Sequence, residues 1–404
     1  MHRDCPSAPA TRPALEVADV LRARLPKYRD SYPLLPRQLR AANALVRCRT
    51  AALGGFASQC DECGATTVQY ASCRNRHCPK CQTLTQTRWV ERQCDKLLDI
   101  GYWHIVFTLP HDLNPLARQQ PAPVYRLLFK AASQTLLEFG RNPRWLGGEI
   151  GVTMVLHTWG QNLGQHIHVH AIVTGGALSP DRERWLPARN TFLFPTKALS
   201  SVFRGKYLDF LAQAHRSGEL RLPGTEDIDD AGDFECLTTA LRSHNWVVYA
   251  KPPFASAAHV LAYLGRYTHK IAIANHRLVD FDGDHVRFRW RDYADGNRRK
   301  TMRLHADEFV RRFLLHVLPR GFTRLRHYGL LANRDRDKKL ALCRALIDQP
   351  APPPREPETP QAMMLRLTGV DITKCRHCGS GTLQRVHALV PGFAASFRRS
   401  RRPP

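Results

Sequence analysis

The sequence predicts an α+β protein, in which a helical N-terminal region precedes an antiparallel sheet flanked by helices. Three observations favour this class. Gln165–Val173 alternates three histidines with apolar residues, which is the period of a β-strand. A second strand pattern at Gly151–His157 precedes it, and the turn signal Gly160–Gly164 joins the two into a hairpin. An amphipathic helical pattern occurs at Pro123–Phe139, and a basic helix is expected at Thr196–Ala214.

The other elements follow from the same rules. Leu15–Leu53 carries apolar residues at helical spacing, and Ala306–Val317 predicts a late helix. Pro252–Pro253 is expected to break the strand that precedes it. The remaining strand patterns are rich in aromatic and β-branched residues or lie beside a turn signal such as Asp282-Gly283; they are Tyr102–Leu109, Trp246–Tyr249, Arg277–Phe281, Val286–Trp290 and Lys300–Leu304.

Length and charge narrow the function. The chain has 404 residues, which predicts two to three domains, and its 60 Lys+Arg against 35 Asp+Glu give a net charge of +25. This balance favours a polyanionic partner, nucleic acid first and an anionic membrane surface second. No apolar run approaches the roughly 20 residues of a spanning helix, and no signal segment opens the chain. We therefore expect a cytoplasmic, nucleoid-associated protein whose 12 cysteines are metal ligands or buried thiols.

Two Cys-x-x-Cys motifs, 14 residues apart, predict a zinc site in the N-terminal region. Each motif can form a corner around a metal, and four thiolates would close a tetrahedral, structural site with no position left for water. Cys73 and His77 are spare ligands. The expected zinc ligands are Cys60, Cys63, Cys78 and Cys81.

A further Cys-x-x-Cys motif, Cys375–Cys378, lies beyond the proline-rich segment Gln349–Pro360. The proline content indicates a linker. The motif has no obvious paired motif, and His377 or His387 could complete a second metal site with it.

The histidine strand and a pair of tyrosines are the remaining unusual features. Strand alternation places His166, His168 and His170 on one face, where each buried ring needs a hydrogen-bond partner or a ligand. A bound cation would satisfy them together, whereas a surface strand would need no ligand. Tyr263 and Tyr267, four residues apart in a predicted helix, would share one helical face.

These motifs together resemble the transposases of the insertion sequence 91 family and its common-region relatives, which are HUH-type, two-tyrosine, rolling-circle enzymes. The matching stretches run in the family's order; they are Tyr32–Gln38, Cys73–Cys81, Gln165–Gly176 and Tyr263–Lys270. The resemblance implies an HUH endonuclease domain behind an N-terminal zinc-binding domain. It also implies cleavage and joining of single-stranded DNA at the ends of a mobile element.

The family chemistry implies roles for these residues. A tyrosine would attack a phosphodiester to form a 5′-phosphotyrosine, with Mg²⁺ or Mn²⁺ as the catalytic ion. His168 and His170 are the first expected ligands, and the third is either His166 or His157. Two tyrosines suit two successive transfers, although one of them could be a packing residue. Arg266 and Lys270 flank them and are DNA-binding candidates, or solvated charges.

The expected domains are a zinc-binding region at 1–95, the nuclease at 96–330, and a C-terminal extension with linker and tail at 331–404. Two other functions use the same motifs. A replication initiator or relaxase would apply this chemistry to another DNA substrate, and a zinc-dependent DNA-binding protein would need no catalysis. The second leaves the histidine strand unexplained. The sequence does not fix the oligomeric state.

Overall fold

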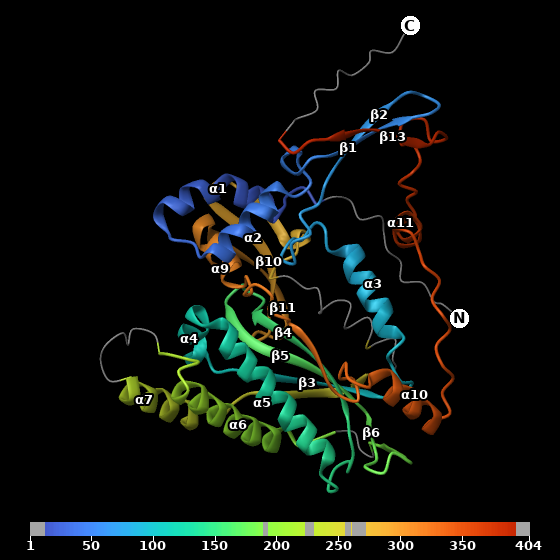
Figure 1. Ribbon diagram of the computed structural model, residues 1–404. Coiled ribbons are helices and arrows are strands. Elements are labelled where there is room, and N and C mark those ends of the chain that lie inside the picture. The colour runs from blue at the N-terminus through green and yellow to red at the C-terminus, as the bar shows by residue number, and fades with distance from the viewer. Residues whose placement is uncertain (1–12, 189–192, 223–229, 255–259, 261–271, 393–404) are drawn as a thin grey trace. The chain divides into compact units, whose positions relative to one another are not determined.

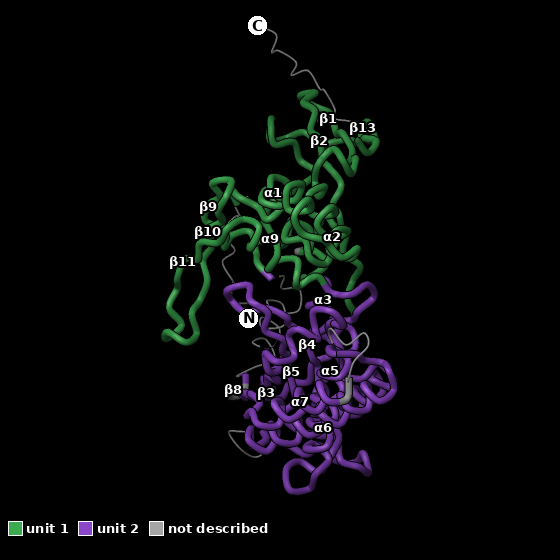
Figure 2. The backbone as a smooth tube through the Cα atoms, turned by 90° about the vertical axis from the view of Figure 1, so that its left-hand side faces the viewer, with its two compact units in different colours: residues 1–87, 273–317, 354–404 green, residues 88–272, 318–353 purple. Residues whose placement is uncertain are grey.

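The computed structural model describes residues 13–188, 193–222, 230–254, 260 and 272–392. The chain forms two compact units, and neither is continuous in sequence (Figure 2). Unit 1 combines residues 1–87, 273–317 and 354–404, and unit 2 combines 88–272 and 318–353. Both units mix helices with antiparallel sheets, which confirms the predicted α+β class. No helix in the described ranges is long and apolar enough to cross a membrane.

Unit 2 is built on a five-stranded antiparallel sheet in the order β12-β4-β5-β3-β8 (Figure 1). Its strands are β3 (Tyr102–Thr108), β4 (Gly151–Trp159), β5 (Gln165–Thr174), β8 (Val248–Phe254) and β12 (Leu325–Gly329). The predicted β4–β5 hairpin is present, with β5 at the centre of the sheet. The histidine strand β5 therefore forms hydrogen-bonded antiparallel pairs with β3 on one side and with β4 on the other.

One strand differs from the prediction. β8 continues through Pro252–Pro253, which were expected to end it. The strand lies at the edge of the sheet, where only one side is paired, and its register against β3 shifts between Tyr102 and His104. A proline has no N–H to donate to a ladder, and an edge strand with an irregular register tolerates this loss.

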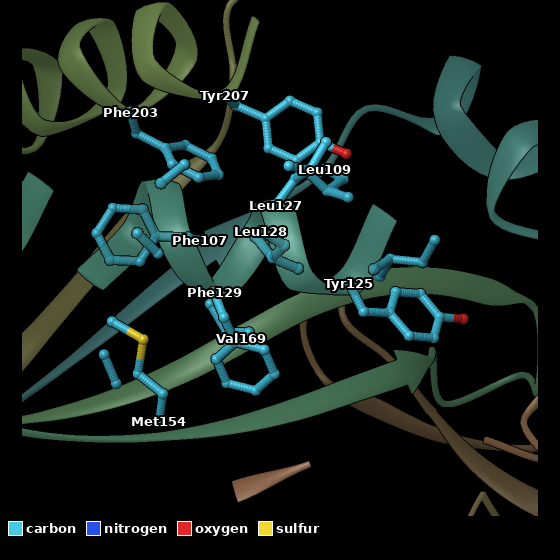
Figure 3. Close-up of a cluster of buried hydrophobic side chains, with 14 of the residues drawn as sticks. Phe107, Leu109, Tyr125, Leu127, Leu128, Phe129, Met154, Val169, Phe203 and Tyr207 are labelled. Atoms are coloured by element: carbon cyan, nitrogen blue, oxygen red, sulfur yellow. The ribbon is translucent and has the colours of Figure 1, made fainter. Parts of the chain in front are cut away.

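The two faces of the central sheet are different. Ile167, Val169 and Ala171 of β5 lie in the hydrophobic core with the apolar side chains of α5 (Pro121–Arg141) and α6 (Thr196–Arg216). In Figure 3, Val169 and Met154 lie near Phe129 of α5. Phe203 and Tyr207 extend from α6 into the same cluster. Burying each large apolar side chain contributes about 1.5–3 kcal/mol. The helices therefore fix this face as the core, and the histidines take the other face.

The remaining elements of unit 2 are shorter. They are α4 (Asn114–Gln119), α7 (Asp230–Ser243), α10 (Arg336–Leu346), the 3₁₀ helix His111–Leu113 and a two-stranded sheet of β6 (Gly176–Leu178) and β7 (Trp185–Pro187). α3 (Thr83–Cys94) spans the boundary between the two units.

In unit 1, α1 (Val17–Ser31) and α2 (Pro36–Arg47) pack with α9 (Ala306–Leu315). The Arg24 guanidinium donates to both carboxylate oxygens of Asp307, at 2.6 and 3.0 Å. The prediction of consecutive domains at 1–95, 96–330 and 331–404 thus differs from the compact units. Contacts between segments distant in sequence bring residues 273–317 to the N-terminal helices, and Leu383–Leu389 beside Gly55–Cys60.

Two three-stranded sheets complete unit 1. The first has the order β11-β10-β9 and contains β9 (Leu278–Phe281), β10 (His285–Asp292) and β11 (Arg298–His305), preceded by the 3₁₀ helix Asn275–Arg277. The second has the order β13-β1-β2 and contains β1 (Gly55–Cys60), β2 (Thr66–Tyr70) and β13 (Leu383–Leu389) (Figure 1). The 3₁₀ helix Ala51–Leu53 precedes β1, and α11 (Pro360–Thr368) follows the proline-rich segment.

Candidate metal centres

The histidine face of the central sheet brings three imidazoles together. His168 of β5 lies directly opposite His157 of β4 in the antiparallel register, and His170 lies two residues further along the same face. One ring nitrogen from each of His157, His168 and His170 lies within 4.8 Å of the others. His157 and His168 are buried, with 3% and 8% of their surface exposed. Buried polar rings at this spacing suit a shared cation.

His168 and His170 each form a hydrogen bond through ring nitrogen Nδ1, which leaves Nε2 available to the shared cation. Nδ1 of His168 donates to the backbone carbonyl of His166 at 2.8 Å, so Nε2 keeps its lone pair for a ligand bond. Nδ1 of His170 lies 2.9 Å from Nε2 of His104, which extends from the neighbouring strand β3. A second hydrogen bond of this kind fixes the orientation of metal-binding imidazoles. The residues present therefore fit a divalent ion.

His104 is a part of this arrangement that the sequence analysis missed. Burial and, secondly, the positive charge of Lys251 together lower its pKa to about 3. The register pairs His104 with Ile172, which places both on the histidine face. The signal in the sequence is weak, because His104 is a single histidine within an apolar strand pattern.

The structure treats the two alternatives for the third ligand differently. His157 belongs to the cluster of ligand nitrogens, whereas His166 falls outside it among the described residues. Instead, Nδ1 of His166 lies 3.4 Å from Nε2 of His111, and the two rings meet edge to face. Burial, and then His111, lower the pKa of His166.

The predicted tyrosine motif lies outside the described residues. This applies to Tyr263, Tyr267, Arg266 and Lys270. Val260, three residues before Tyr263, is described and is fully buried. It packs with Tyr102 and Ile172. Ile172 lies on the histidine face of β5, so the chain just before the tyrosines contacts that face of the sheet.

The structure corrects the predicted grouping of the cysteines. Cys60, Cys63, Cys78 and Cys81 do not share one site but divide between two clusters. The first cluster, called cluster A below, contains Cys48, Cys73, Cys78 and Cys81. The second, called cluster B, contains Cys60, Cys63, Cys375 and Cys378.

The β1–β2 hairpin is the physical reason for this division. Cys60 and Cys63 lie at its tip, where the Cys60 amide donates to the Ala65 carbonyl. Cluster A lies at its base, where the Arg49 amide donates to Ala71 and the Cys73 amide points at Cys48 Sγ. The two ends of a hairpin cannot converge on one ion.

Of the two additional ligands that the sequence suggested, cluster A contains Cys73 and does not contain His77. The sulfurs of Cys73 and Cys81 lie 3.8 Å apart, and those of Cys78 and Cys48 lie 3.5 Å apart. Hydrogen bonds with Cys73 and Cys78 lower the pKa of the Cys48 thiol to about 6. His77 is outside the ligand groups of the described chain. No motif marks Cys48, a single cysteine directly after α2.

Cluster B joins the C-terminal motif to the N-terminal region. The sulfurs of Cys60 and Cys378 lie 3.7 Å apart, and those of Cys63 and Cys375 lie 3.8 Å apart. Backbone N–H groups of Gly381 and Ser380 lower the pKa of the Cys378 thiol to about 6. Within the described residues, neither histidine proposed to complete the C-terminal motif, His377 or His387, belongs to this cluster.

Comparison with known proteins finds family matches for both the N-terminal cysteine-rich region and the region that contains the clustered histidines. A family model described as "Transposase zinc-binding domain" matches residues 20–109, and one described as "Putative transposase" matches residues 151–339. A protein named "Putative transposase y4qJ" of Sinorhizobium fredii is 45% identical over 373 residues, which cover 91% of this chain and 94% of that protein. The chain belongs to the insertion sequence 91 family of transposases.

A second relative supports the same placement. "Transposase for insertion sequence element IS801" of Pseudomonas savastanoi pv. phaseolicola is 26% identical over 346 residues, which cover 85% of this chain and 82% of that protein. No solved structure matches the chain. The zinc-binding family region contains all of cluster A, whereas Cys375 and Cys378 lie outside both matched regions.

The transposase also carries a row of exposed arginines that the sequence analysis did not single out. On one face of the β10–β11 pair, Arg287 lies opposite Arg303, and Arg291 opposite Arg299, with Arg289 between them. Val286 and Phe288 occupy the other face and are buried. The signal was the alternation Val-Arg-Phe-Arg-Trp-Arg at residues 286–291. We call the five arginines the arginine face.

Proposed function

We propose that this transposase cleaves and rejoins single-stranded DNA through a 5′-phosphotyrosine intermediate, in rolling-circle transposition of an insertion sequence. The observation that carries the proposal is the cluster of His157, His168 and His170 on adjacent strands of a family member. A structural protein would gain nothing from three imidazoles, two of them buried, whose ring nitrogens converge on one point. A phosphoryl-transfer enzyme needs a cation site beside its nucleophile.

The proposed nucleophiles are Tyr263 and Tyr267. The phenol of one tyrosine loses its proton, and its oxygen forms a bond to the phosphorus of the scissile phosphodiester. The bond from phosphorus to the 3′ oxygen breaks, and that oxygen takes up a proton to become a free 3′-hydroxyl. The phosphotyrosine keeps the energy of the bond, so a later 3′-hydroxyl can reverse the step and join the strand. The contact of Val260 with the histidine face supports this choice of nucleophiles.

A Mg²⁺ or Mn²⁺ ion held by the three histidines would polarise the phosphate and favour the ionised phenol, whose ordinary pKa is near 10. His157, His168 and His170 would bind the ion, and His104 would orient His170. Imidazole ligands bind Mn²⁺ more readily than Mg²⁺.

DNA binding itself is assigned to positive surfaces rather than to the metal. A net charge of +25 favours counterion release from a polyanion. Arg266 and Lys270 remain candidates beside the tyrosines, and the arginine face offers further phosphate contacts. Two successive transfers, one at each end of the moving strand, would use both tyrosines in turn.

The test is covalent capture. Full-length protein is incubated with labelled single-stranded oligonucleotides of the element's ends and Mn²⁺, and denaturing gels are examined for a protein–DNA adduct. We expect an adduct that peptide mapping assigns to Tyr263 or Tyr267. The double variant Tyr263→Phe, Tyr267→Phe should form none, because only the hydroxyls are removed. Tyr293→Phe, at an exposed tyrosine outside the proposed site, is the matched control. An adduct mapped to neither tyrosine would overturn the proposal.

A further inference from the structure

We propose that cluster B is a second zinc site, separate from the one in cluster A, and that its ion fastens the C-terminal segment to the N-terminal cysteine-rich region. Its four ligands are Cys60, Cys63, Cys375 and Cys378. Two of these residues lie outside both family regions, so the matched zinc-binding domain does not account for the site.

The sulfur spacing fits a tetrahedral zinc ion. A Zn–S bond of about 2.3 Å in a tetrahedron separates neighbouring sulfurs by about 3.8 Å. In cluster B the Cys60–Cys378 and Cys63–Cys375 sulfurs are 3.7 and 3.8 Å apart. Disulfides would instead need a separation of about 2.0 Å.

The two motifs of cluster B have the same backbone turn. The amide of Gly64 donates to the Cys60 carbonyl at 3.1 Å, and the amide of Gly379 donates to the Cys375 carbonyl at 3.0 Å. In the C-terminal motif, the His377 amide points at Cys375 Sγ at 3.3 Å, and the Gly381 amide at Cys378 Sγ at 3.4 Å. Backbone N–H groups placed in this way stabilise metal-bound thiolates.

Backbone pairing holds the two motifs together. β13 pairs antiparallel with β1, and Cys60 lies opposite Leu383 in that register. At the end of the pair, the Asp61 amide donates to the Thr382 carbonyl at 3.1 Å, and the Thr382 amide donates to the Asp61 side chain at 2.7 Å. A Cβ atom on Gly381 would lie 2.3 Å from Cys60 Sγ, so only glycine permits this approach.

The sequence separation explains what such an ion would do. Cys60 and Cys378 are 318 residues apart, and β13 itself is a largely exposed strand that buries little apolar surface. Closing so long a loop costs entropy, although the cost grows only slowly with length. An exposed strand with few buried contacts is weakly held by packing. A thiolate-bound zinc ion would supply the missing free energy.

The first experiment counts the zinc that a thiol-specific mercurial releases from purified full-length protein. Because the mercurial reacts only with thiols, an ion held by histidines is not counted. We expect two zinc ions per chain in the wild type. The variants Cys60→Ser, Cys63→Ser and Cys375→Ser, Cys378→Ser should each retain one, and the combined quadruple variant should also retain one. Cys236→Ser, an exposed cysteine outside cluster B, should retain two. One ion in the wild type, or two in the Cys375, Cys378 variant, would overturn the proposal.

Two milder variants keep the test decisive if serine variants fail to fold. Cys378→His retains a zinc ligand but removes one thiolate. In Co²⁺-substituted protein it should keep two metal ions and lose part of the sulfur-to-cobalt charge-transfer absorbance. An unchanged spectrum would contradict ligation by Cys378.

Gly381→Ala should leave all four thiols in place and still weaken one of the two zinc sites, measured by competition with a chelator. Gly205→Ala, at a position where a Cβ meets open space, is the control. Equal zinc retention by these two variants would contradict the close approach of the two motifs.

Discussion

The histidine face and the cysteine clusters are assembled in opposite ways. Two of the three clustered histidines share one strand, and the third lies across a hairpin turn, so all fall within residues 157–170. Cluster B joins residues 60–63 to residues 375–378, and the two ligand sets interleave along the chain. Strand periodicity decides the first arrangement. The second depends on which distant strands pair, and that information is not local.

The histidine face and the cysteine clusters also differ in their expected roles. The histidines are side chains of a rigid central sheet whose other face is packed by α5 and α6. Strand pairing and the packing of the opposite face set their positions, as a preorganised centre requires. The cysteines lie mainly at hairpin ends and on turns, so we expect a bound zinc ion to contribute much of the free energy that holds each cluster together. Removing ligands should therefore abolish chemistry in one region and folding in the other.

The largest expected effect is on cleavage. The double variant His168→Ala, His170→Ala should reduce DNA cleavage below detection, because two ligands of one ion are lost. Most DNA affinity should remain, since positive surface charge supplies it. Adduct yield and equilibrium binding to the same oligonucleotide provide the two measurements. Full cleavage with residual metal excluded would contradict the assignment.

The second effect is on folding of the cysteine-rich region. Cys78→Ser should release the cluster A zinc and unfold the segment that carries Cys73, Cys78 and Cys81, because structural zinc contributes about 10–16 kcal/mol, as much as a whole domain's stability of about 5–15 kcal/mol. Amide hydrogen exchange at residues 71–82 should rise to unprotected rates, while the central sheet stays protected. Cys236→Ser is the control. Retained protection in Cys78→Ser would show that cluster A needs no metal.

The same contrast shows how far sequence analysis can go. The β4–β5 hairpin and the helices α5 and α6 agree with the predictions, because periodicity and turn residues specify them locally. The two cysteines of each Cys-x-x-Cys motif do fall in one cluster, but the predicted pairing of Cys60 and Cys63 with Cys78 and Cys81 is wrong. A Cys-x-x-Cys motif specifies its own turn but not its partner, and β13 was not predicted as a strand. His104 was missed because its role depends on the β3–β5 register.

The third prediction separates the two alternatives for the remaining ligand. His157→Ala should lower the cleavage rate by at least about 10- to 100-fold, and high Mn²⁺ should partly restore it. His166→Ala should stay near wild type, since its ring contacts His111 instead. Mn²⁺ titrations of cleavage by the two variants measure this difference. The reverse pattern would move the third ligand to His166.

A smaller effect is expected at His104, which positions His170 without binding the ion. His104→Gln can keep a hydrogen bond to Nδ1 of His170, whereas His104→Ala removes it. The alanine variant should need about 10- to 100-fold more Mn²⁺ for half-maximal cleavage, with a nearly normal rate at saturation. The glutamine variant should recover part of this loss. A lower saturated rate with an unchanged Mn²⁺ requirement would indicate only a packing role.

The smallest effect concerns the arginine face, and it tests whether binding and chemistry are separate. Binding should weaken steeply with salt, with a slope of log K against log salt of about −0.7 per contacted phosphate on single strands. Replacing Arg289, Arg291 and Arg299 by Gln should flatten the slope by up to about 2 in total. A weaker effect is expected from Arg287→Gln, because Asp280 already pairs with that guanidinium.

The triple arginine variant also gives a cleavage readout. At low salt and saturating DNA, its adduct yield should match the wild type, because the histidine cluster and both tyrosines are intact. A flat wild-type slope would argue against electrostatic binding. An unchanged slope in the triple variant would remove the arginine face from the DNA-binding surface and leave Arg266 and Lys270 as the candidates. Lost cleavage at saturating DNA would instead show that these arginines act in the chemical step.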